Sequence, residues 1–362
     1  MFYHLLYQTM GSDTFFRVFK YISFRTAMAT LTALLITFVF SPWFIKVLKS
    51  KQYGQTIRED GPQSHLQKEG TPTMGGGIIL LSFVLSTLLW ARLDSPFVWV
   101  AVGVSCLFGL IGFVDDYMKV AKKNTAGLSG KIRIVVEFAI GFVMMYVLLT
   151  QTSLGSDLAI PFRWEPLPDV PYWIFIPFGA FVLVGTANAV NLTDGADGLA
   201  VGPVMTTSLV YAIFAYIAGN MVFAGYLNMP YIVASGELTV FCGAIFGSCL
   251  AFLWYNTHPA SVFMGDVGSL SLGSALGVVA VSTKNELMLL IVGGVFAMET
   301  ISVIIQVGSF KLTGKRVFKM APYHHSLELR GWAEQKMVVR LWIISIILAL
   351  MGLAALKLKF NI

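Results

Sequence analysis

The sequence contains few charged residues. Of its 362 residues, 12% are Asp, Glu, Lys or Arg, and 56% are hydrophobic. A soluble domain carries about twice that charged fraction. The mean hydropathy is +0.75, so the composition excludes an ordinary soluble domain and predicts an integral membrane protein. The chain also lacks internal repeats, low-complexity tracts and a linker long enough to divide it, and we therefore expect a single domain over residues 1–362.

Cysteine is scarce as well. Cys106, Cys242 and Cys249 all lie in apolar runs and lack the spacing of metal ligands. They are expected to be small packing residues, which argues against a cysteine-bound metal. The first 24 residues also lack the basic start, uninterrupted apolar core and cleavage site of a signal peptide.

Long apolar runs are abundant. A run of 17 or more mostly apolar residues can cross a hydrocarbon core of about 30 Å as a helix. The sequence therefore predicts an all-α polytopic membrane protein with about ten transmembrane helices. The ten runs are 24–48, 75–93, 97–118, 132–150, 171–190, 199–218, 237–256, 267–283, 286–307 and 338–357.

The distribution of basic residues orients these helices, because Lys and Arg in short loops stay on the cytoplasmic side. If both termini are outside, 17 of the 25 basic residues lie in inside segments and eight in outside segments. We therefore predict an N-out, C-out topology. The formal charge of +6 then reflects topology and attraction to anionic lipid or phosphate, and no nucleic-acid partner is expected.

One polar segment, NAVNLTDGADGLA at residues 188–200, lies between two apolar runs. Its Asn188, Asn191, Asp194 and Asp197 recur every third residue, so they share one face if the preceding helix continues through them. Oxygen-rich side chains suit Mg²⁺ and the hydrogen-bonding groups of a nucleotide. The alternative is a helix-end cap followed by polar turn residues.

Two adjacent carboxylates, Asp115 and Asp116, end the third predicted helix. They point about 100° apart, so one can face a metal and phosphate site and the other a lipid entrance. Basic residues follow, and they either neutralise phosphates or merely set the topology. These residues are Lys119, Lys122, Lys123, Lys131 and Arg133.

The loop after the seventh predicted helix carries a third set of polar residues. Asp266 is a carboxylate that can join those near Asp194 in an oxygen-ligand cation site, and Asn256 is the amide of the same loop. Phe263 can stack on a base, although a loop aromatic is also a common membrane-interface anchor.

Other candidates are less specific. Lys68 precedes a glycine-rich turn that can hold a phosphate or simply cap a membrane helix. His324 and His325 lack the spacing of a zinc pair, which favours phosphate binding or proton transfer. Glu137 and Glu299 lie inside apolar runs, and interhelical hydrogen bonding explains them as well as a function does.

All five predicted inside loops carry such clusters. Several carboxylates, neighbouring cations and a membrane setting suit phosphoryl transfer from a nucleotide-activated donor to a lipid acceptor. The chain resembles the polyprenyl-phosphate N-acetylhexosamine-1-phosphate transferase superfamily through FVDD at 113–116, NAVNLTDGADGL at 188–199 and FMGDVGS at 263–269. Within it, the segments at 70–76 and 320–332 resemble the branch that uses muramoyl-pentapeptide donors.

The resemblance implies transfer of phospho-MurNAc-pentapeptide from UDP-MurNAc-pentapeptide to undecaprenyl phosphate. UMP and lipid I would form, Mg²⁺ would be required, and the enzyme would be a homodimer in the bacterial inner membrane with its active site facing the cytoplasm. It implies a set of catalytic carboxylates, in which Asp266 is the Mg²⁺ ligand. It also implies that two histidines lie near the donor's sugar or phosphates and that one of them, His324, takes part in catalysis. The carboxylates are Asp115, Asp116 and Asp266, the histidines are His324 and His325, and the nucleotide-site residues are Lys68, Asn191, Asp194, Asp197, Asn256 and Phe263.

Two departures from the superfamily pattern stand out, namely Ser326 where a third histidine is common and Ala196 where leucine is usual. Two other functions compete with this one. A sibling transferase would use UDP-N-acetylglucosamine or a related donor, and the segment at 320–332 argues against it. A transporter or flippase would need coupling residues near the membrane midplane and often repeats, whereas only Glu299 lies that deep.

Overall fold

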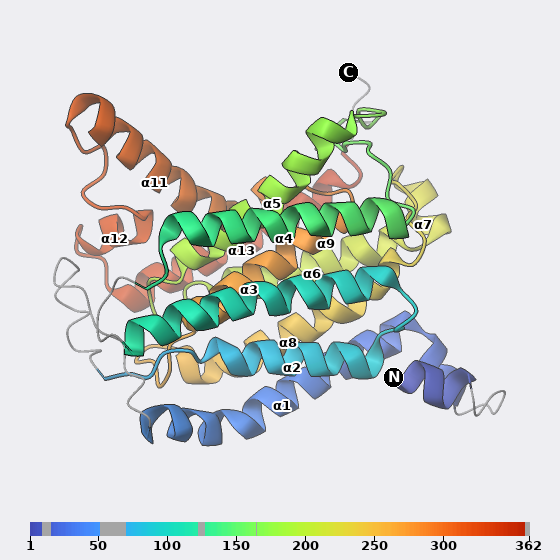
Figure 1. The fold of residues 1–362 in the computed structure, drawn as a ribbon, viewed down its shortest axis with the longest axis horizontal. Coiled ribbons are helices and arrows are strands. Elements are labelled where there is room, and N and C mark those ends of the chain that lie inside the picture. Colours follow the sequence, from blue (N-terminus) through green and yellow to red (C-terminus); the bar gives the residue numbers. More distant parts are fainter. Residues whose placement is uncertain (9–15, 51–69, 122–126, 164, 359–362) are drawn as a thin grey trace.

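Helices form the whole architecture (Figure 1). The structure is a computed structural model that describes residues 1–8, 16–50, 70–121, 127–163 and 165–358. Within these ranges there is no strand, and one isolated antiparallel bridge joins Leu158 to Leu167. The predicted all-α class is confirmed.

The predicted apolar runs all form helices. The long helices are α1 Ile22–Ser50, α2 Gly76–Trp90, α3 Pro96–Ala121, α4 Gly130–Gln151, α5 Tyr172–Thr193, α6 Val201–Ala218, α8 Leu238–Asn256, α9 Gly265–Ser282, α11 Gly294–Thr313 and α13 Glu334–Ala355. The short helices are η1 Tyr3–Gln8 and η2 Phe16–Lys20, which precede α1, and α7 Met221–Tyr226, η4 Ser235–Glu237, α10 Leu289–Val292 and α12 Tyr323–Glu328, which lie between long helices.

Two of the predicted runs differ from the observed helices. Nine helices in the described part of the chain are long and apolar enough to cross a membrane, whereas α2 has only 15 residues. It ends at Trp90, and Ala91 is extended, with ψ at 159°. The predicted run 286–307 is divided at Gly293 into α10 and α11, and α11 continues to Thr313. Adjacent glycines at the division lower the helix propensity there.

Helix α9 is the centre of the bundle. All of its residues from Val267 to Ser282 are buried, and it packs mainly against α3 and α5. Small residues permit this contact: a Cβ added at Gly273 would lie 2.6 Å from the Cα of Ala187 on α5. Close backbone approach of this kind is how membrane helices associate without a hydrophobic driving force. The N-terminus of α9 is thereby fixed between the ends of α3 and α5.

Helix α1 bends along its length (Figure 1), and it contains Pro42. Proline has no N–H, so the carbonyl of Phe38 four residues earlier has no helical donor. The hydroxyl of Tyr255 on α8 donates to that oxygen at 3.0 Å. The contact satisfies the carbonyl and ties α1 to α8.

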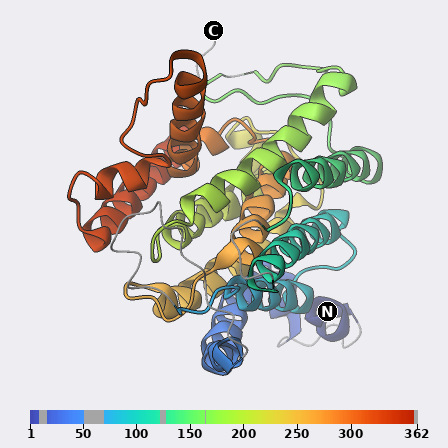
Figure 2. The ribbon, with the colours of Figure 1, turned by 60° about the vertical axis from the view of Figure 1, so that its left-hand side comes forward.

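The bundle has two distinct ends. The end at the left of Figure 1 holds the last turns of α3 and α5, the first turns of α4 and α9, and α12, and Figure 2 brings it forward. We call it the aspartate end, because Asp115, Asp116 and Asp266 lie there. The other end is called the opposite end. The N-out, C-out orientation stays a prediction.

Candidate active site

Three aspartates from two helices converge. Asp115 and Asp116 lie near the end of α3, Asp266 is the second residue of α9, and one oxygen of each lies within 4.8 Å of the others. Gly112 makes this possible, since an added Cβ would lie 2.2 Å from the backbone oxygen of Asp266. Gly265, at φ +73°, turns the chain into α9 beside Asp116. Sequence reasoning placed Asp266 near Asp194, and the two carboxylates do lie close enough to interact; the aspartates of α3 are further neighbours of Asp266.

Lys119 neutralises part of this charge. Its Nζ lies 2.5 Å from Asp115 Oδ2 and 2.9 Å from Asp266 Oδ2. Backbone N–H groups help: Leu128 donates to Asp115 at 2.6 Å, and Val267 donates to Asp116 at 3.3 Å. Lys119 therefore binds the carboxylates directly, so it does more than set the orientation of the chain in the membrane.

Asn191 joins the aspartates from α5. Its Nδ2 donates to Asp266 Oδ1 at 2.7 Å and to Ser269 Oγ at 2.8 Å. Arg133 on α4 donates to Asn191 Oδ1 at 3.3 Å and lies 3.5 Å from Asp266 Oδ2. Four helices, α3, α4, α5 and α9, thus contribute polar side chains to one centre.

The expected single face of four polar residues was wrong. Helix α5 ends at Thr193, so Asn188 and Asn191 are helical while Asp194 caps the helix and Asp197 lies in the following turn. Burial, and then the negative charges of Asp266 and Asp116, raise the pKa of Asp194 well above its ordinary value. Asp194 is near the aspartates, whereas Asp197 belongs to a second cluster.

This second cluster contains Asp197, His258 and Glu334. His258 Nδ1 lies 3.0 Å from Asp197 Oδ2 and 3.5 Å from Glu334 Oε2. The backbone N–H of Asp197 donates to Glu334 Oε1 at 2.9 Å. The contacts join the α5–α6 turn, the loop after α8 and the start of α13. Sequence reasoning assigned no role to His258, a polar residue of the same loop as Asn256, and did not single out Glu334, because the three residues are distant in the chain and share no motif.

Asn256 and Phe263 hold the loop between α8 and α9. Asn256 Oδ1 accepts from the Gly198 N–H at 3.1 Å, and its Nδ2 donates to Val262 O at 2.9 Å. The half-buried Phe263 is anchored by its backbone, which donates to Pro72 O at 2.9 Å and accepts from Gly75 N at 2.8 Å. The loop is thereby connected to the segment that begins α2.

His324 is wholly buried on α12. Its Nδ1 lies 3.2 Å from Oε2 of Glu299, which is equally buried on α11. Its ring faces Gly195, where an added Cβ would lie 2.3 Å from Nε2. His324 is therefore next to the turn that carries Asp194. Its neighbour His325 contacts Glu328 at 2.9 Å on the same short helix.

Comparison with known proteins decides the family. Residues 98–284 match glycosyl transferase family 4. Three full-length relatives are each named phospho-N-acetylmuramoyl-pentapeptide-transferase, and 99% of this chain aligns with the whole of each. They come from Syntrophus aciditrophicus, Desulfatibacillum aliphaticivorans and Desulfotalea psychrophila, at 53%, 54% and 51% identity. The chain belongs to the phospho-N-acetylmuramoyl-pentapeptide-transferase family. The resemblance inferred from the motifs is confirmed.

The residues singled out from the sequence are not equally well placed by the structure. Ser326, at the position of the third histidine, is fully buried within α12. Lys68 lies outside the described residues. Arg133 and Glu137, spaced i,i+4 and 3.0 Å apart, were underrated by sequence reasoning, although that spacing is a readable signal of pairing on a helix.

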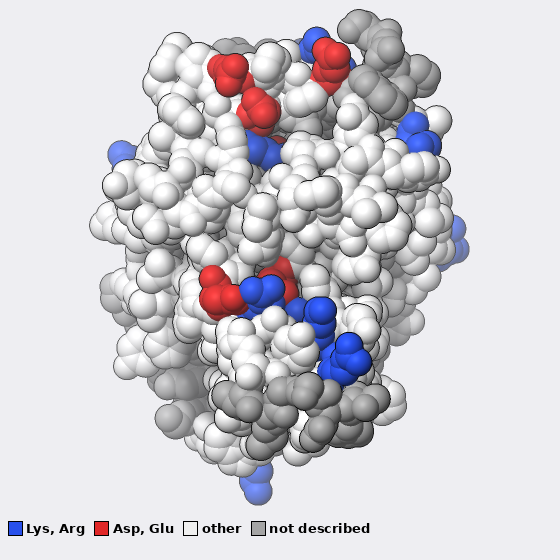
Figure 3. All heavy atoms as spheres, turned by 90° about the vertical axis from the view of Figure 1, so that its right-hand side faces the viewer, with Lys and Arg blue, Asp and Glu red and all other residues white. Residues whose placement is uncertain are grey.

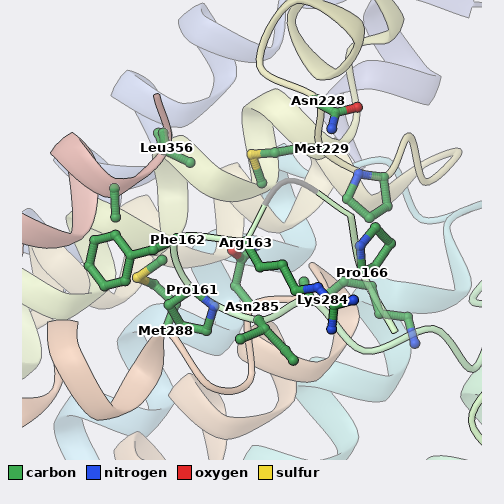
Figure 4. A pocket seen from close by; sticks show the side chains of 14 residues that line it. Pro161, Phe162, Arg163, Pro166, Asn228, Met229, Lys284, Asn285, Met288 and Leu356 are labelled. Carbon is green, nitrogen blue, oxygen red and sulfur yellow. The ribbon is translucent and has the colours of Figure 1, made fainter. Parts of the chain in front are cut away.

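The opposite end contains a cavity of about 50 Å³ (Figure 4). The segment after α4 and the turn after α9 contribute Phe162, Arg163, Lys284 and Asn285 to its lining. None of the described candidate residues lines it. Figure 3 shows the face at this end, where charged side chains form separate groups on a mostly uncharged surface.

Proposed function

We propose that this chain transfers phospho-MurNAc-pentapeptide from UDP-MurNAc-pentapeptide to undecaprenyl phosphate. The products are UMP and undecaprenyl-pyrophosphoryl-MurNAc-pentapeptide, known as lipid I, in the first membrane step of peptidoglycan synthesis. The observation that carries this proposal is the convergence of Asp115, Asp116 and Asp266 in a chain that matches named relatives over their full length. Those names favour this donor over UDP-N-acetylglucosamine and an enzyme over a transporter.

The aspartate cluster fits Mg²⁺. Its three oxygens are hard donors within 4.8 Å of one another, and Mg²⁺ prefers such ligands with water and substrate phosphates completing its shell. We assign Asp266 as the principal ligand, because Asn191 fixes one of its oxygens at 2.7 Å and orients the carboxylate. When bound there, the ion would stabilise negative charge on the leaving UMP.

The protein's own residues then have distinct tasks. The second pKa of a phosphate monoester is about 6, so the acceptor is largely ionised at neutral pH and needs little help from a base. We favour direct in-line attack of an acceptor oxygen on the donor's β-phosphorus. Asp116 orients the acceptor or removes its last proton, and Lys119 balances charge beside it. The competing route passes through a phosphosugar on Asp115 or Asp116.

Binding residues surround this centre in the proposal. Asn191 and Asp194 lie beside the aspartates, and His324 adjoins Asp194 through Gly195. We assign to the nucleotide the residues Lys68, Asn191, Asp194, Asp197, Asn256 and Phe263. His324 and His325 are assigned to the donor's sugar or phosphates, with a catalytic part for His324.

The proposed location is the bacterial inner membrane, with the aspartate end facing the cytoplasm. Basic residues in the predicted inside loops support this orientation, because they concentrate near the aspartate end. We further propose a homodimer. Cysteine accessibility from either side of sealed vesicles tests the orientation, and mass measurement in lipid nanodiscs tests the assembly.

The deciding experiment measures UMP release by purified protein. UDP-MurNAc-pentapeptide and undecaprenyl phosphate are supplied together or singly, with and without Mg²⁺, beside an Asp266→Asn variant. We expect release only with both substrates and metal, and its collapse in the variant. Full activity in the variant would place the metal elsewhere. No release from the wild type would overturn the proposal, and UDP-N-acetylglucosamine would then be tried as donor.

A further inference from the structure

Arg133 and Glu137 form a buried network on α4 that none of the steps above uses. Glu137 is wholly buried, and the side chain of Arg133 is 15% exposed. Through Asn188 and Asn191 the pair reaches Asp266 on α9. An ionisable group buried within a membrane helix is costly, so its retention calls for a role.

Both oxygens of Glu137 accept hydrogen bonds. Oε1 accepts from Arg133 Nε at 3.0 Å, and Oε2 accepts from Asn188 Nδ2 at 2.6 Å. A carboxylate can accept at both atoms, whereas a glutamine at this position would present its NH₂ to one of the two donors. The negative charge of Glu137 therefore determines how the Arg133 guanidinium is turned.

The guanidinium uses two of its three nitrogens to hold this orientation. Nε donates to Glu137, and Nη2 donates to Asn188 Oδ1 at 2.8 Å and Asn191 Oδ1 at 3.3 Å. Nη1 makes one long contact to described residues, 3.5 Å to Asp266 Oδ2. Nη1 therefore lies beside the aspartate cluster and makes no closer contact to described residues, which leaves it able to donate to a ligand. A guanidinium held in this way matches the geometry of phosphate oxygens.

We infer that Arg133 binds a phosphate oxygen of the donor's diphosphate through Nη1, beside Asp266, and that Glu137 is the positioning residue that holds Arg133 for this contact. The inference rests on the proposed function, which supplies the diphosphate. Arg25 provides the contrast within the same molecule. Its guanidinium donates through Nη1 and Nη2 to Glu237 and Trp90 O, and its side chain is 1% exposed, so it offers nothing to a ligand.

The test compares ligands with and without phosphate. The binding of UDP and of uridine is measured in detergent by their competition with the donor UDP-MurNAc-pentapeptide, and KM and kcat for the donor are measured beside it. The proteins compared are the wild type, Glu137→Gln, Arg133→Lys and the double variant. We expect each single variant to weaken UDP binding and raise the donor KM about tenfold or more, the loss of a charge-assisted hydrogen bond. Uridine binding should stay unchanged. The double variant should be no worse than Arg133→Lys, because Glu137 acts through Arg133.

Glu237→Gln is the matched control, since it also removes one charge from a buried Glu–Arg pair. It should lower the melting temperature and leave UDP and uridine binding unchanged. Equal losses for uridine and UDP in the α4 variants, or independent effects in the double variant, would overturn the inference. If Glu137→Gln does not fold, Arg133→Lys alone decides through the same comparison. Wild-type protein that binds UDP but releases no UMP would instead count against the proposed function.

Discussion

Buried charges occur at both ends of the bundle, but they are paired differently. At the opposite end, Arg25 meets Glu237 through two hydrogen bonds of 2.5 and 2.7 Å, and their side chains are 1% and 5% exposed. The Arg92 N–H also donates to Glu237 at 2.9 Å. At the aspartate end, three carboxylates share Lys119, whose side chain is 35% exposed.

The difference separates structural charge from functional charge. A pair that is matched one to one and sealed from solvent joins α1 to the segments that flank it, and removing one partner leaves a buried charge uncompensated. A surplus of carboxylates costs stability, because the charges repel one another. Such a surplus is explained when a bound cation and phosphates complete the site. The predictions below test whether the two ends differ in this way.

The largest expected effect is that of Asp116→Asn at the aspartate end. Loss of a group that orients or deprotonates the acceptor should reduce kcat by about 10²- to 10⁴-fold. The melting temperature should stay the same or rise, because one of three repelling carboxylates is removed. UMP release and thermal unfolding in detergent measure the two effects. A large loss of stability would mean that these charges are structural after all.

Glu237→Gln at the opposite end should give the reverse pattern. Arg25 would keep its charge in a buried site without a carboxylate, which costs about 3 kcal/mol. Activity per folded molecule should not change, since the pair lies at the far end of the bundle from Asp266. Thermal unfolding and the fraction of active molecules are measured together. A fall in kcat equal to that of Asp116→Asn would erase the distinction between the ends.

Gly112→Ala tests the backbone contact that brings α3 to α9. The added Cβ would lie 2.2 Å from Asp266 O, so the helices must separate. Overpacking costs about 1–3 kcal/mol, and a displacement of about 1 Å can reduce turnover about 10²-fold. Gly103→Ala on the same helix is the control, because no atom lies within 4 Å of its added Cβ. Equal effects of the two substitutions would contradict the role of Gly112.

The sequence predicted the helices well because a membrane core imposes one simple rule, a long apolar run. It did not predict where α5 ends, and the end of α5 determines which residues of the polar segment lie near the aspartates. A three-residue spacing is compatible with a helical face only while the helix lasts. Since α5 stops at Thr193, Asp194 stays near the aspartates and Asp197 moves to His258 and Glu334.

The sequence also did not predict which residues contact one another in the site. FVDD and FMGDVGS identified Asp115, Asp116 and Asp266, but only packing places them together. The contact of His324 with Glu299 joins residues 25 positions apart, and no periodicity relates them. Glycine at 112 carried the information that two backbones meet, yet it is indistinguishable by type from Gly103, which meets nothing.

The smallest effect concerns Glu286, a buried and weakly paired carboxylate at the opposite end. Glu286 is 2% exposed, and its oxygens accept no hydrogen bond from described residues. Burial raises its pKa to about 7, although Lys284 opposes the shift. The folded protein therefore holds a proton that the unfolded chain releases above about pH 4.5, so stability should fall between pH 4.5 and 7. Burial lowers the pKa of Lys284 to about 8, so stability should recover above pH 8.

Glu286→Gln should remove the fall in stability between pH 4.5 and 7. The recovery assigned to Lys284 should begin below pH 8 in the variant, because the charge of Glu286 raises the pKa of Lys284 in the wild type. At pH 7.5 the variant should be more stable than the wild type, by on the order of 1–3 kcal/mol, and at pH 4.5 the two should be alike. Melting temperatures in detergent at these two pH values measure the effect. If the wild type and the variant lose stability in parallel as the pH rises, Glu286 is not the group responsible.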